Sequence, residues 1–567
     1  MNEASPNTSP VILPTISEYL NHHADQQGDR IWLRDRAGDE FTTWTWQQAR
    51  QEAHAVAAWM EQHFGSAQHD DHGTVMGILS NNRAHWMLAD MAMVCSGNVS
   101  APLFTTMLAD TAQYILDFTK ARAIVVGQAA NWDSIKQILP KDIEVIALPG
   151  FDPGVDHIQW NDVLKDFRGQ SPSYQVDRQD LVTLPFTSGT TGLPKGVMQN
   201  HDSMLIPMQR AGESFQMKSE PRFLSYLPLA HIAERQLVWI QSMVHCGEVT
   251  FNEDLSTLAR DMADTKPTFF FGAPRVWEQL HQGLLAKLGG QQALDDALAQ
   301  DKEGTQQFLQ AVLGLHEAEY MLTAAAPTPP ALIEWYESIG ITLFEGYGQS
   351  EAMGLIGNSP EHRRVGSIGK LIEGVEAKIL DDGELCVKST GLAPGYFNNP
   401  EKTAETFVDG WVHTGDKAKI DEDGFYYITG RVKDYFKTIQ GKFVAPPPIE
   451  GEFAECQDVE QLCLLGRGYS KTVMIVVLSE RAMQQDKGTT TQVLKDQAQR
   501  VNETIDKHAR IGAVIVAAEP WTIENGMLTP TLKIKRDEVE ATFGTNAEAL
   551  ARNAAEQGVV IIDWHGV

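Results

Sequence analysis

The chain has 567 residues, which at about 150 residues per domain predicts three to four folding units. Hydrophobic residues make up 43% of it, enough for large cores, so global disorder is excluded. Its 46 Lys and Arg against 75 Asp and Glu give a net charge of −29. Such an acidic chain is not expected to bind nucleic acid or an anionic membrane surface, although a local cationic pocket for a small polyanion remains compatible with it.

The sequence predicts a cytoplasmic protein. Its first residues lack the basic and apolar regions of a secretory signal, and its longest apolar runs, such as 237–240, are far too short for a transmembrane helix. Five cysteines without a C-x-x-C pair indicate neither a disulfide framework nor a zinc site.

The N-terminal part alternates between strand and helix patterns. After a loose tail over residues 1–14, we expect a strand at 42–46, a helix at 47–62, a buried strand at 75–79 and a helix at 84–95. Short β-rich runs follow at 99–104, 123–126 and 145–148. This alternation predicts an α/β fold with a mostly parallel sheet.

The pattern changes near residue 380. Strand-like runs at 377–380, 383–387 and 424–428, separated by Asp- and Gly-rich turns, predict an antiparallel section. A smaller α+β segment follows, with strands near 461–465, 472–478 and 513–517 and helices near 491–508 and 535–543. We therefore expect a large N-terminal body over 15–430, a hinge at 431–433 and a small mobile C-terminal domain over 434–567.

The most informative motif is the loop Thr-Ser-Gly-Thr-Thr-Gly-Leu-Pro-Lys-Gly at 187–196. Its glycines let successive backbone N–H groups converge, its hydroxyls add donors, and Lys195 adds charge, which together favour anion binding. The loop lacks the Gly-Lys-Ser/Thr ending of a Walker A motif, so an ordinary P-loop ATPase is not indicated. A short Gly/Thr turn alone is more often a flexible loop, so the prediction depends on the complete string.

Four further motifs follow in order. They are Leu-Pro-Leu-Ala-His at 227–231, Gly-Tyr-Gly-Gln-Ser-Glu at 346–351, His-Thr-Gly-Asp at 413–416 and a Thr-Leu-Lys string ending at 533. An Asp such as Asp416 can accept two hydrogen bonds from the cis-diol of a ribose. Taken singly, each has an ordinary structural explanation: a core histidine, a glycine turn, a solvated aspartate or a surface lysine.

The order of these motifs resembles that of the AMP-forming acyl-adenylate superfamily, and the similarity covers the chain after its N-terminal tail. The resemblance implies binding of ATP, Mg²⁺ and CoA and activation of a carboxylic acid. It assigns catalytic roles to Lys533, Glu351 and His231 and metal ligation to Thr187 and Glu351. It assigns nucleotide or CoA contacts to Thr187, Ser188, Gly189, Thr190, Thr191, Gly192, Lys195, Ala325, Ala326, Pro327, Glu345, Gly346, Tyr347, Gly348, Ser350, Asp416, Arg431, Lys433, Lys437 and Gly441.

The resemblance also implies distinct tasks for these residues. Ala325–Pro327 and the Tyr347 ring would enclose the adenine, Asp416 and Arg431 would hold the ribose, and Lys433 would be the hinge about which the small domain turns. Gly441 would face the pantetheine arm of CoA. The apolar segment 237–244 could line an acyl pocket, although its periodicity favours a core helix.

The strings at 437–450 and 528–533 are similar to those of long-chain fatty acyl-CoA synthetases. We therefore expect an AMP-forming ligase that converts a medium- or long-chain fatty acid into its CoA thioester. The alternatives are an acyl-AMP ligase that loads a carrier protein, a luciferase-like oxygenase and a catalytically silent nucleotide-binding regulator. A homodimer is possible, and the sequence does not give the acyl chain length.

Overall fold

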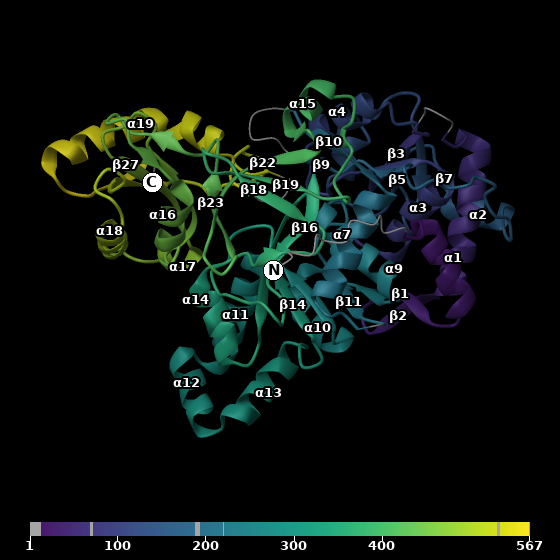
Figure 1. Cartoon of the computed structure of the whole chain (residues 1–567), viewed down its shortest axis with the longest axis horizontal. Helices are drawn as coiled ribbons and strands as arrows, with labels where there is room; N and C mark the ends of the chain where they lie inside the picture. Colours follow the sequence, from purple (N-terminus) through teal and green to yellow (C-terminus); the bar gives the residue numbers. More distant parts are fainter. Residues whose placement is uncertain (1–12, 68–71, 188–192, 219, 530–532, 566–567) are drawn as a thin grey trace, which may run out of the picture.

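The computed structural model describes residues 13–67, 72–187, 193–218, 220–529 and 533–565. Five sheets and a small hairpin form a large N-terminal body and a smaller C-terminal unit, which lies to one side of the body in Figure 1. Most of the predicted tail, 1–12, lies outside the described residues, whereas Leu13 is buried in the core.

The first sheet of the body is largely parallel, as expected. Its strand order is β20-β10-β8-β4-β3-β5-β6-β7, with β9 paired to β10. β10 runs antiparallel to β20, β8 and β9, whereas the pairings from β8 through β7 are parallel. Its strands are β3 (Val75–Leu79), β4 (Val99–Pro102), β5 (Ala123–Val126), β6 (Glu144–Ala147), β7 (Ile158–Gln159), β8 (Leu181–Thr183), β9 (Phe186–Thr187), β10 (Lys195–Asn200) and β20 (Gly395–Tyr396).

Two more sheets complete the α/β part of the body, in the orders β11-β12-β1-β2 and β13-β14-β15-β16-β17. Their strands are β1 (Ile31–Ala37), β2 (Glu40–Thr45), β11 (Arg222–Ser225), β12 (Glu248–Phe251), β13 (Phe269–Gly272), β14 (Tyr320–Thr323), β15 (Leu343–Gln349), β16 (Ala352–Gly357) and β17 (Lys370–Leu371).

The predicted antiparallel section forms the fourth sheet, in the order β18-β19-β22-β21 with β23 also paired to β22. A short hairpin and a four-stranded sheet, β26-β27-β28-β29, make up the C-terminal unit. These strands are β18 (Glu376–Ile379), β19 (Glu384–Lys388), β21 (Phe407–Val408), β22 (Trp411–Ile420), β23 (Tyr426–Arg431), β24 (Phe436–Lys437), β25 (Phe443–Val444), β26 (Val459–Leu465), β27 (Thr472–Leu478), β28 (Ile511–Ala517) and β29 (Ile561–His565).

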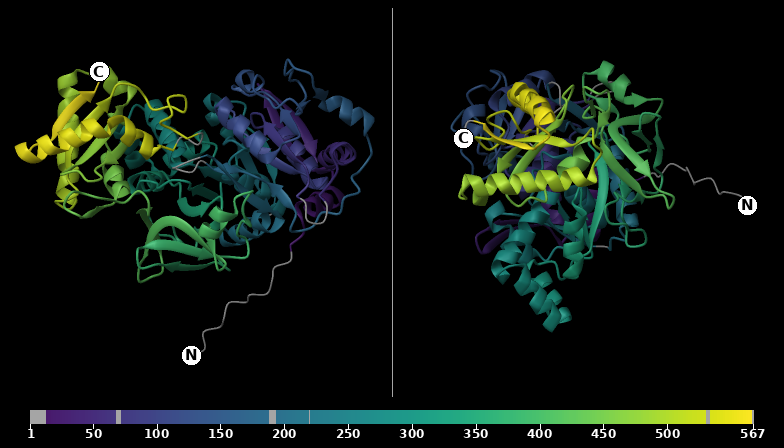
Figure 2. Two further views of the ribbon diagram at one scale, coloured as in Figure 1. Left: turned by 90° about the horizontal axis from the view of Figure 1, so that it is seen from above. Right: turned by 90° about the vertical axis from the view of Figure 1, so that its left-hand side faces the viewer.

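Helices surround these sheets, and α12 and α13 form an arm that projects from the body (Figures 1 and 2). Among the described residues, no helix is both long and apolar enough to cross a membrane. The helices are α1 (Ile16–Gln26), α2 (Trp46–Phe64), α3 (Ala84–Cys95), α4 (Ala109–Thr119), α5 (Trp132–Ile135), α6 (Trp160–Asp166), α7 (His201–Ser214), α8 (Ile232–Glu234), the π-helix η1 (Arg235–Ile240), α9 (Gln241–His245), the 3₁₀-helix η2 (Leu255–Thr257), α10 (Leu258–Thr265), α11 (Pro274–Leu288), α12 (Gln291–Gln300), α13 (Lys302–Val312), α14 (Pro330–Ser338), α15 (Pro400–Thr406), α16 (Pro446–Phe453), α17 (Glu480–Met483), α18 (Lys487–Thr504) and α19 (Arg536–Gln557).

The apolar segment after His231 belongs to the core, as its periodicity favoured. The residues of η1 are buried, and Gln236 donates from Nε2 to the carbonyl of Ser203 at 2.9 Å. That carbonyl would ordinarily receive the N–H of residue 207, but Pro207 has none. Gln241, five residues on, donates in the same way to Met208 at 3.0 Å. The wide π turn thus places two amides on the face that meets α7.

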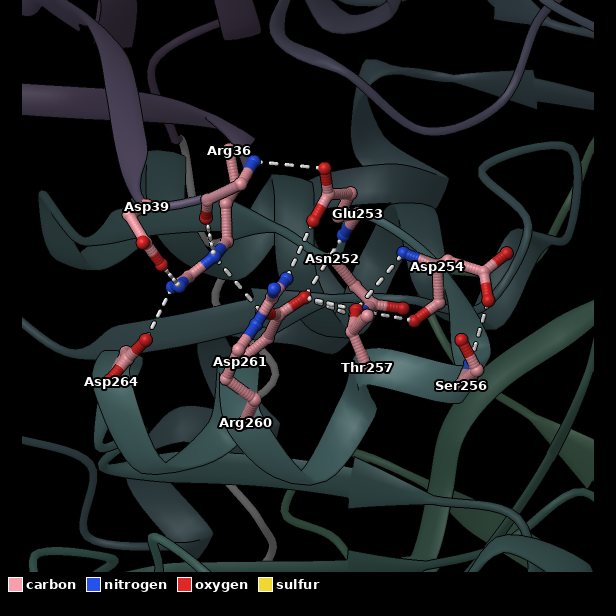
Figure 3. A network of polar contacts seen from close by, with 11 residues as sticks. Arg36, Asp39, Asn252, Glu253, Asp254, Ser256, Thr257, Arg260, Asp261 and Asp264 are labelled. Carbon is pink, nitrogen blue, oxygen red and sulfur yellow. Dashed lines mark hydrogen bonds and ion pairs between the residues drawn. The ribbon is translucent and has the colours of Figure 1, made fainter.

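An ionic network fastens the β1–β2 hairpin to α10 (Figure 3). Asp261 is fully buried and accepts hydrogen bonds from Asn252, the backbone of Glu253, Thr257 and Arg260. Its other contact is with Arg36 Nε at 3.2 Å, and the Arg36 side chain is only 3% exposed. Burial alone would raise the pKa of Asp261, but these hydrogen bonds lower it below its usual value.

Candidate active site

The two ends of the predicted phosphate loop, 187–196, are held together by the antiparallel pairing of β9 with β10. Thr187, at the end of β9, lies opposite Lys195, at the start of β10. Ser188, Gly189, Thr190, Thr191 and Gly192 lie outside the described residues. Burial lowers the pKa of Lys195, and the charges of Lys402 and Lys433 lower it further. Lys195 thus lies within electrostatic reach of two other lysines, with Glu351 and Glu405 opposing their effect, and such a cationic setting suits a polyphosphate.

The predicted metal ligand Glu351 lies at the turn between β15 and β16, where Tyr396 holds it. The Tyr396 hydroxyl donates to Glu351 Oε1 at 2.6 Å, and Lys195 Nζ lies 5.5 Å from the centre of the Tyr396 ring. Burial and the neighbouring carboxylate raise the pKa of Tyr396, so its hydroxyl stays a donor. Tyr396 was not predicted, because it is brought to Glu351 only by the pairing of β10 with β20.

The segments predicted to enclose the adenine lie side by side. β14 and β15 are parallel with Thr323 opposite Glu345, so Ala325, Ala326 and Pro327 leave β14 next to Gly346 and Tyr347. Ala325 has a φ of +73°, a left-handed conformation that turns the chain. On its other side β15 packs closely on β16, because a Cβ at Gly348 would lie 3.1 Å from Met353 Cα.

Two other predicted residues on this sheet have mainly structural contacts. The Glu345 carboxylate is buried, accepts a hydrogen bond from the backbone N of Thr328 at 3.1 Å, and has a pKa raised by burial to about 7. The carbonyl of Ser350 accepts from Gln199 Nε2 at 2.7 Å, which anchors the turn that carries Glu351.

Asp416 is the centre of the predicted ribose site. It is buried on β22 opposite Arg431 of β23, whose Nε lies 3.0 Å from Asp416 Oδ1. The hydroxyl of Tyr347 and Nε2 of Gln349 both donate to Asp416 Oδ2 at 2.6 Å. Both oxygens of this carboxylate thus face hydrogen-bond donors, and a carboxylate in such a setting can also accept from the two hydroxyls of a diol.

The C-terminal unit delivers Lys533 to this site. Burial lowers the pKa of Lys533, Arg431 lowers it further, and the carboxylates of Asp416 and Glu351 oppose the change. The backbone N of Lys533 donates to Thr529 Oγ1 at 3.0 Å, which fixes the lysine at the end of its loop. Lys533 is far from these partners in the sequence and comes near them because the C-terminal unit packs against the body.

His231 lies within the same electrostatic environment. Burial lowers its pKa to about 4, and the charge of Lys533 contributes to this shift. His231 Nδ1 accepts the N–H of Ala233 at 3.1 Å, capping α8. The imidazole is therefore neutral near pH 7 and carries its proton on Nε2, which makes Nε2 a hydrogen-bond donor.

The residues predicted to meet CoA are not part of this cluster. Lys437 is exposed on the β24–β25 hairpin, with Nζ 4.7 Å from the Phe443 ring. Gly441, at the hairpin tip, has a φ of +73° and faces open space among the described residues. Backbone bonds join Gly468 and Tyr469 to this hairpin, so it moves with the C-terminal unit. Its role toward CoA stays a prediction.

Taken together, the cluster combines cations for a polyphosphate, a carboxylate suited to a hard metal ion, a diol acceptor and a lysine from the C-terminal unit. Such a set can align a carboxylate with the α-phosphate of a nucleotide and stabilise the charge that develops between them.

Both parts of the chain match known protein families. Residues 20–397 match the AMP-binding enzyme family, and residues 433–554 match the AMP-binding enzyme C-terminal domain. Among curated relatives, the long-chain-fatty-acid–CoA ligase FadD15 of Mycobacterium bovis is 27% identical over 525 residues, covering 83% of this chain and 87% of the relative. Fatty acyl-CoA synthetase A of Dictyostelium discoideum is 29% identical over 558 residues, with coverages of 84% and 82%.

Solved structures share the fold. The adenylation–carrier didomain of the Segniliparus rugosus carboxylic acid reductase in complex with AMP superposes with a TM-score of 0.79 at 23% identity, covering 97% of this chain and 83% of that one. ATP-bound MatB from Rhodopseudomonas palustris gives 0.73 at 21% identity, with coverages of 93% and 99%. The predicted α/β architecture with a separate C-terminal α+β unit is confirmed, and the chain belongs to the AMP-binding enzyme family of adenylate-forming, acyl-activating ligases.

Proposed function

We propose that the protein is an AMP-forming acyl-CoA synthetase for medium- to long-chain fatty acids. It would join a fatty acid to the α-phosphate of ATP with release of pyrophosphate and then transfer the acyl group to CoA. The observation that carries the first step is the position of Lys533, within electrostatic reach of His231, Glu351 and Asp416. The names of the curated relatives, a long-chain-fatty-acid–CoA ligase and a fatty acyl-CoA synthetase, support the choice of substrate.

The chemistry needs alignment and charge stabilisation rather than an acid–base pair. A fatty carboxylate is already a nucleophile, so the barrier is its repulsion by the phosphates and the entropy of alignment. Lys195 and the loop would hold the leaving pyrophosphate, Asp416 and Arg431 the ribose, and Lys533 the charge that forms between the two reactants. A neutral His231 adds no cation of its own and offers Nε2–H as a donor.

The residues near the phosphate loop fit a magnesium ion. Glu351 supplies a carboxylate and Thr187 a hydroxyl, both hard oxygen ligands of the kind that Mg²⁺ prefers. When bound, Mg²⁺ supplies charge neutralisation on the phosphates.

The test is carboxylate-dependent exchange of pyrophosphate into ATP, measured across a series of acids of increasing chain length. We expect exchange with medium- and long-chain acids, and CoA-dependent thioester formation once CoA is added. The absence of exchange with every acid would overturn the adenylation. Exchange without a CoA thioester would move the assignment to an acyl-AMP ligase that loads a carrier protein. Oxygen uptake with an acyl-adenylate would favour the luciferase-like reaction.

A further inference from the structure

Three metal-binding side chains share one face of the fourth sheet, although sequence spacing gave no sign of a metal site. Glu384 and Cys386 are two residues apart on β19, so their side chains point to the same face. His413, on β22, pairs directly with Cys386. Their ligand atoms all lie within 4.8 Å of one another.

The His413 ring nitrogen Nδ1 lies between the other two groups. It is 2.9 Å from Glu384 Oε2 and 3.6 Å from Cys386 Sγ. In a tetrahedral zinc site, bonds of about 2.0–2.3 Å place neighbouring ligand atoms roughly 3.3–3.6 Å apart. The two separations from Nδ1 lie on either side of this spacing, and the third pair, Glu384 and Cys386, lies within 4.8 Å, so the three groups are near enough for side-chain rotation to bring them around one ion.

The type of ligand selects the ion. One sulfur, one imidazole nitrogen and one carboxylate oxygen suit Zn²⁺ and its spectroscopic substitute Co²⁺, whereas Mg²⁺ prefers oxygen ligands alone. Cys386 is fully buried, while the Glu384 and His413 side chains are 15% and 29% exposed. An ion would therefore enter past Glu384 and His413 and keep a fourth position open to water.

We propose that Glu384, Cys386 and His413 form a second cation site, for Zn²⁺, distinct from the magnesium position at Glu351. Binding would leave the imidazole proton on Nε2 and release the Cys386 thiol proton to water, so that the thiolate and Nδ1 both face the ion.

The site is connected to the ribose position by Glu384. While Oε2 faces His413, Oε1 accepts the backbone N–H of Gly415 at 3.0 Å, and Gly415 directly precedes Asp416. The hydroxyl of Thr414 also donates to the backbone of β19, at Leu385, at 2.6 Å. A metal ion that draws the Glu384 carboxylate toward itself would shift this turn and thus Asp416. Zn²⁺ is therefore expected to weaken ATP binding, a consequence that rests on the proposed function.

Binding is tested without ATP and without any activity. The full chain, freed of metal with a chelator, is titrated with Co²⁺ while the thiolate-to-cobalt charge-transfer absorption is followed. We expect one saturable equivalent in the wild type and in C246S, which removes a cysteine outside the cluster, and no charge-transfer band in C386S. A band that is absent from the wild type or unchanged in C386S would overturn the site. H413Q provides a second variant should C386S fail to fold, and it should bind more weakly.

The coupling is tested by pyrophosphate exchange in excess magnesium, with Zn²⁺ added in an amount equimolar to the enzyme. We expect the KM for ATP to rise about tenfold in the wild type and C246S, the size of effect typical when the support of a binding residue is disturbed. C386S should show no such rise. An equal rise in C386S would show that zinc acts elsewhere and would overturn the coupling. If the enzyme without zinc does not exchange pyrophosphate into ATP, the proposed function is wrong. The zinc site is judged separately, by the cobalt titration.

Discussion

At the scale of single residues, Lys533 is predicted to act in the first half-reaction only. Replacing it with alanine removes a charge aimed at the reacting groups, so Lys533→Ala should lose pyrophosphate exchange by about 10²–10³-fold. Thioester formation from a supplied acyl-adenylate and CoA should continue, because the predicted rotation about 431–433 would take Lys533 out of the site in that step. Lys535→Ala, two residues away at the start of α19, is the control and should retain both reactions. Equal loss of both reactions in Lys533→Ala would contradict this division.

Tyr396 is the residue whose role in the site emerged only from the structure. Tyr396→Phe removes the hydrogen bond to Glu351 and frees that carboxylate to move toward Lys195, which would close the phosphate site. Hydrogen bonds to charged groups contribute about 1.5–3 kcal/mol, so the KM for magnesium–ATP should rise tenfold or more.

The matched control for this substitution is Tyr336→Phe, which removes a buried hydroxyl bonded to the Trp277 carbonyl at 2.7 Å in another core cluster. It should lower stability without changing that KM. A Tyr396→Phe enzyme with an unchanged magnesium dependence would show that the hydroxyl does not position Glu351.

Most candidate site residues could be proposed from the sequence because each lies in a short motif whose residue types suit one part of the ligand. Asp416, for example, ends the His-Thr-Gly-Asp string, the family resemblance assigns Arg431 fifteen residues later to the same ribose, and the structure pairs the two across β22 and β23. Glu384 and Tyr396 could not be predicted in the same way, because their contacts depend on which strands lie next to each other. Strand pairing between distant segments is not encoded in local spacing.

At the scale of elements, strands with fully apolar sequences were predicted most accurately. The strands at 75–79 and 472–478 have the bounds of β3 and β27. The helix predicted over 535–543 instead runs to Gln557, because Ala547, Ala551 and Ala554 pack on the C-terminal sheet and carry it past Gly544. The helices α11 to α13 were not predicted.

The network around Asp261 is expected to determine how firmly the β1–β2 hairpin is held (Figure 3). Asparagine has one acceptor oxygen in its side chain where aspartate has two, and it carries no charge. It would therefore leave the buried Arg36 guanidinium without the buried carboxylate that it contacts. Asp261→Asn should therefore lower the free energy of unfolding by about 3–5 kcal/mol. Asp264→Asn, which removes a half-exposed partner of the same arginine, should cost at most about 1 kcal/mol. Urea denaturation measures both, and equal effects would contradict a central role for Asp261.

At the scale of the whole molecule, four histidines that are buried or half-buried should make stability sensitive to acid. Burial lowers the pKa values of His54, His231 and His245 to about 4 and that of His201 to about 3. The unfolded chain therefore binds protons near pH 6.5 that the folded protein binds only near pH 3–4, so stability falls as pH decreases through this range. Each such group contributes up to about 1.4 kcal/mol per pH unit.

Two buried carboxyls act in the opposite sense. Burial raises the pKa of Glu234 to about 8 and that of Glu345 to about 7, so their stabilising effect is complete below pH 4.5 and is lost as pH rises toward those values. The four histidines outweigh them between pH 5 and 6, where these six groups give a net loss of up to about 3 kcal/mol per pH unit on acidification. Urea denaturation at several pH values measures this slope. His245→Gln should make it shallower by about 1.4 kcal/mol per pH unit, and an unchanged slope would show that His245 is not held neutral.

The position of the C-terminal unit against the N-terminal body is expected to determine which half-reaction can proceed. The predicted hinge at 431–433 would let the C-terminal unit alternate between one pose with Lys533 in the site and another with Gly441 there. In the present pose Arg275 of α11 contacts Glu460 of β26, with Arg275 Nη2 2.5 Å from Glu460 Oε1. Cysteines at these two positions, joined by a short bifunctional thiol reagent, would hold the pose with Lys533 in place.

We expect the joined double variant to retain pyrophosphate exchange and to lose thioester formation from supplied acyl-adenylate. Each single-cysteine variant, treated with the same reagent, controls for modification of native thiols and should keep both reactions. Because the ion pair is exposed, its removal alone should change stability little. Thioester formation at the normal rate in the joined protein would contradict the hinge, since Gly441 could then act only from where it now lies. Loss of both reactions on joining would place the observed pose outside the adenylation step.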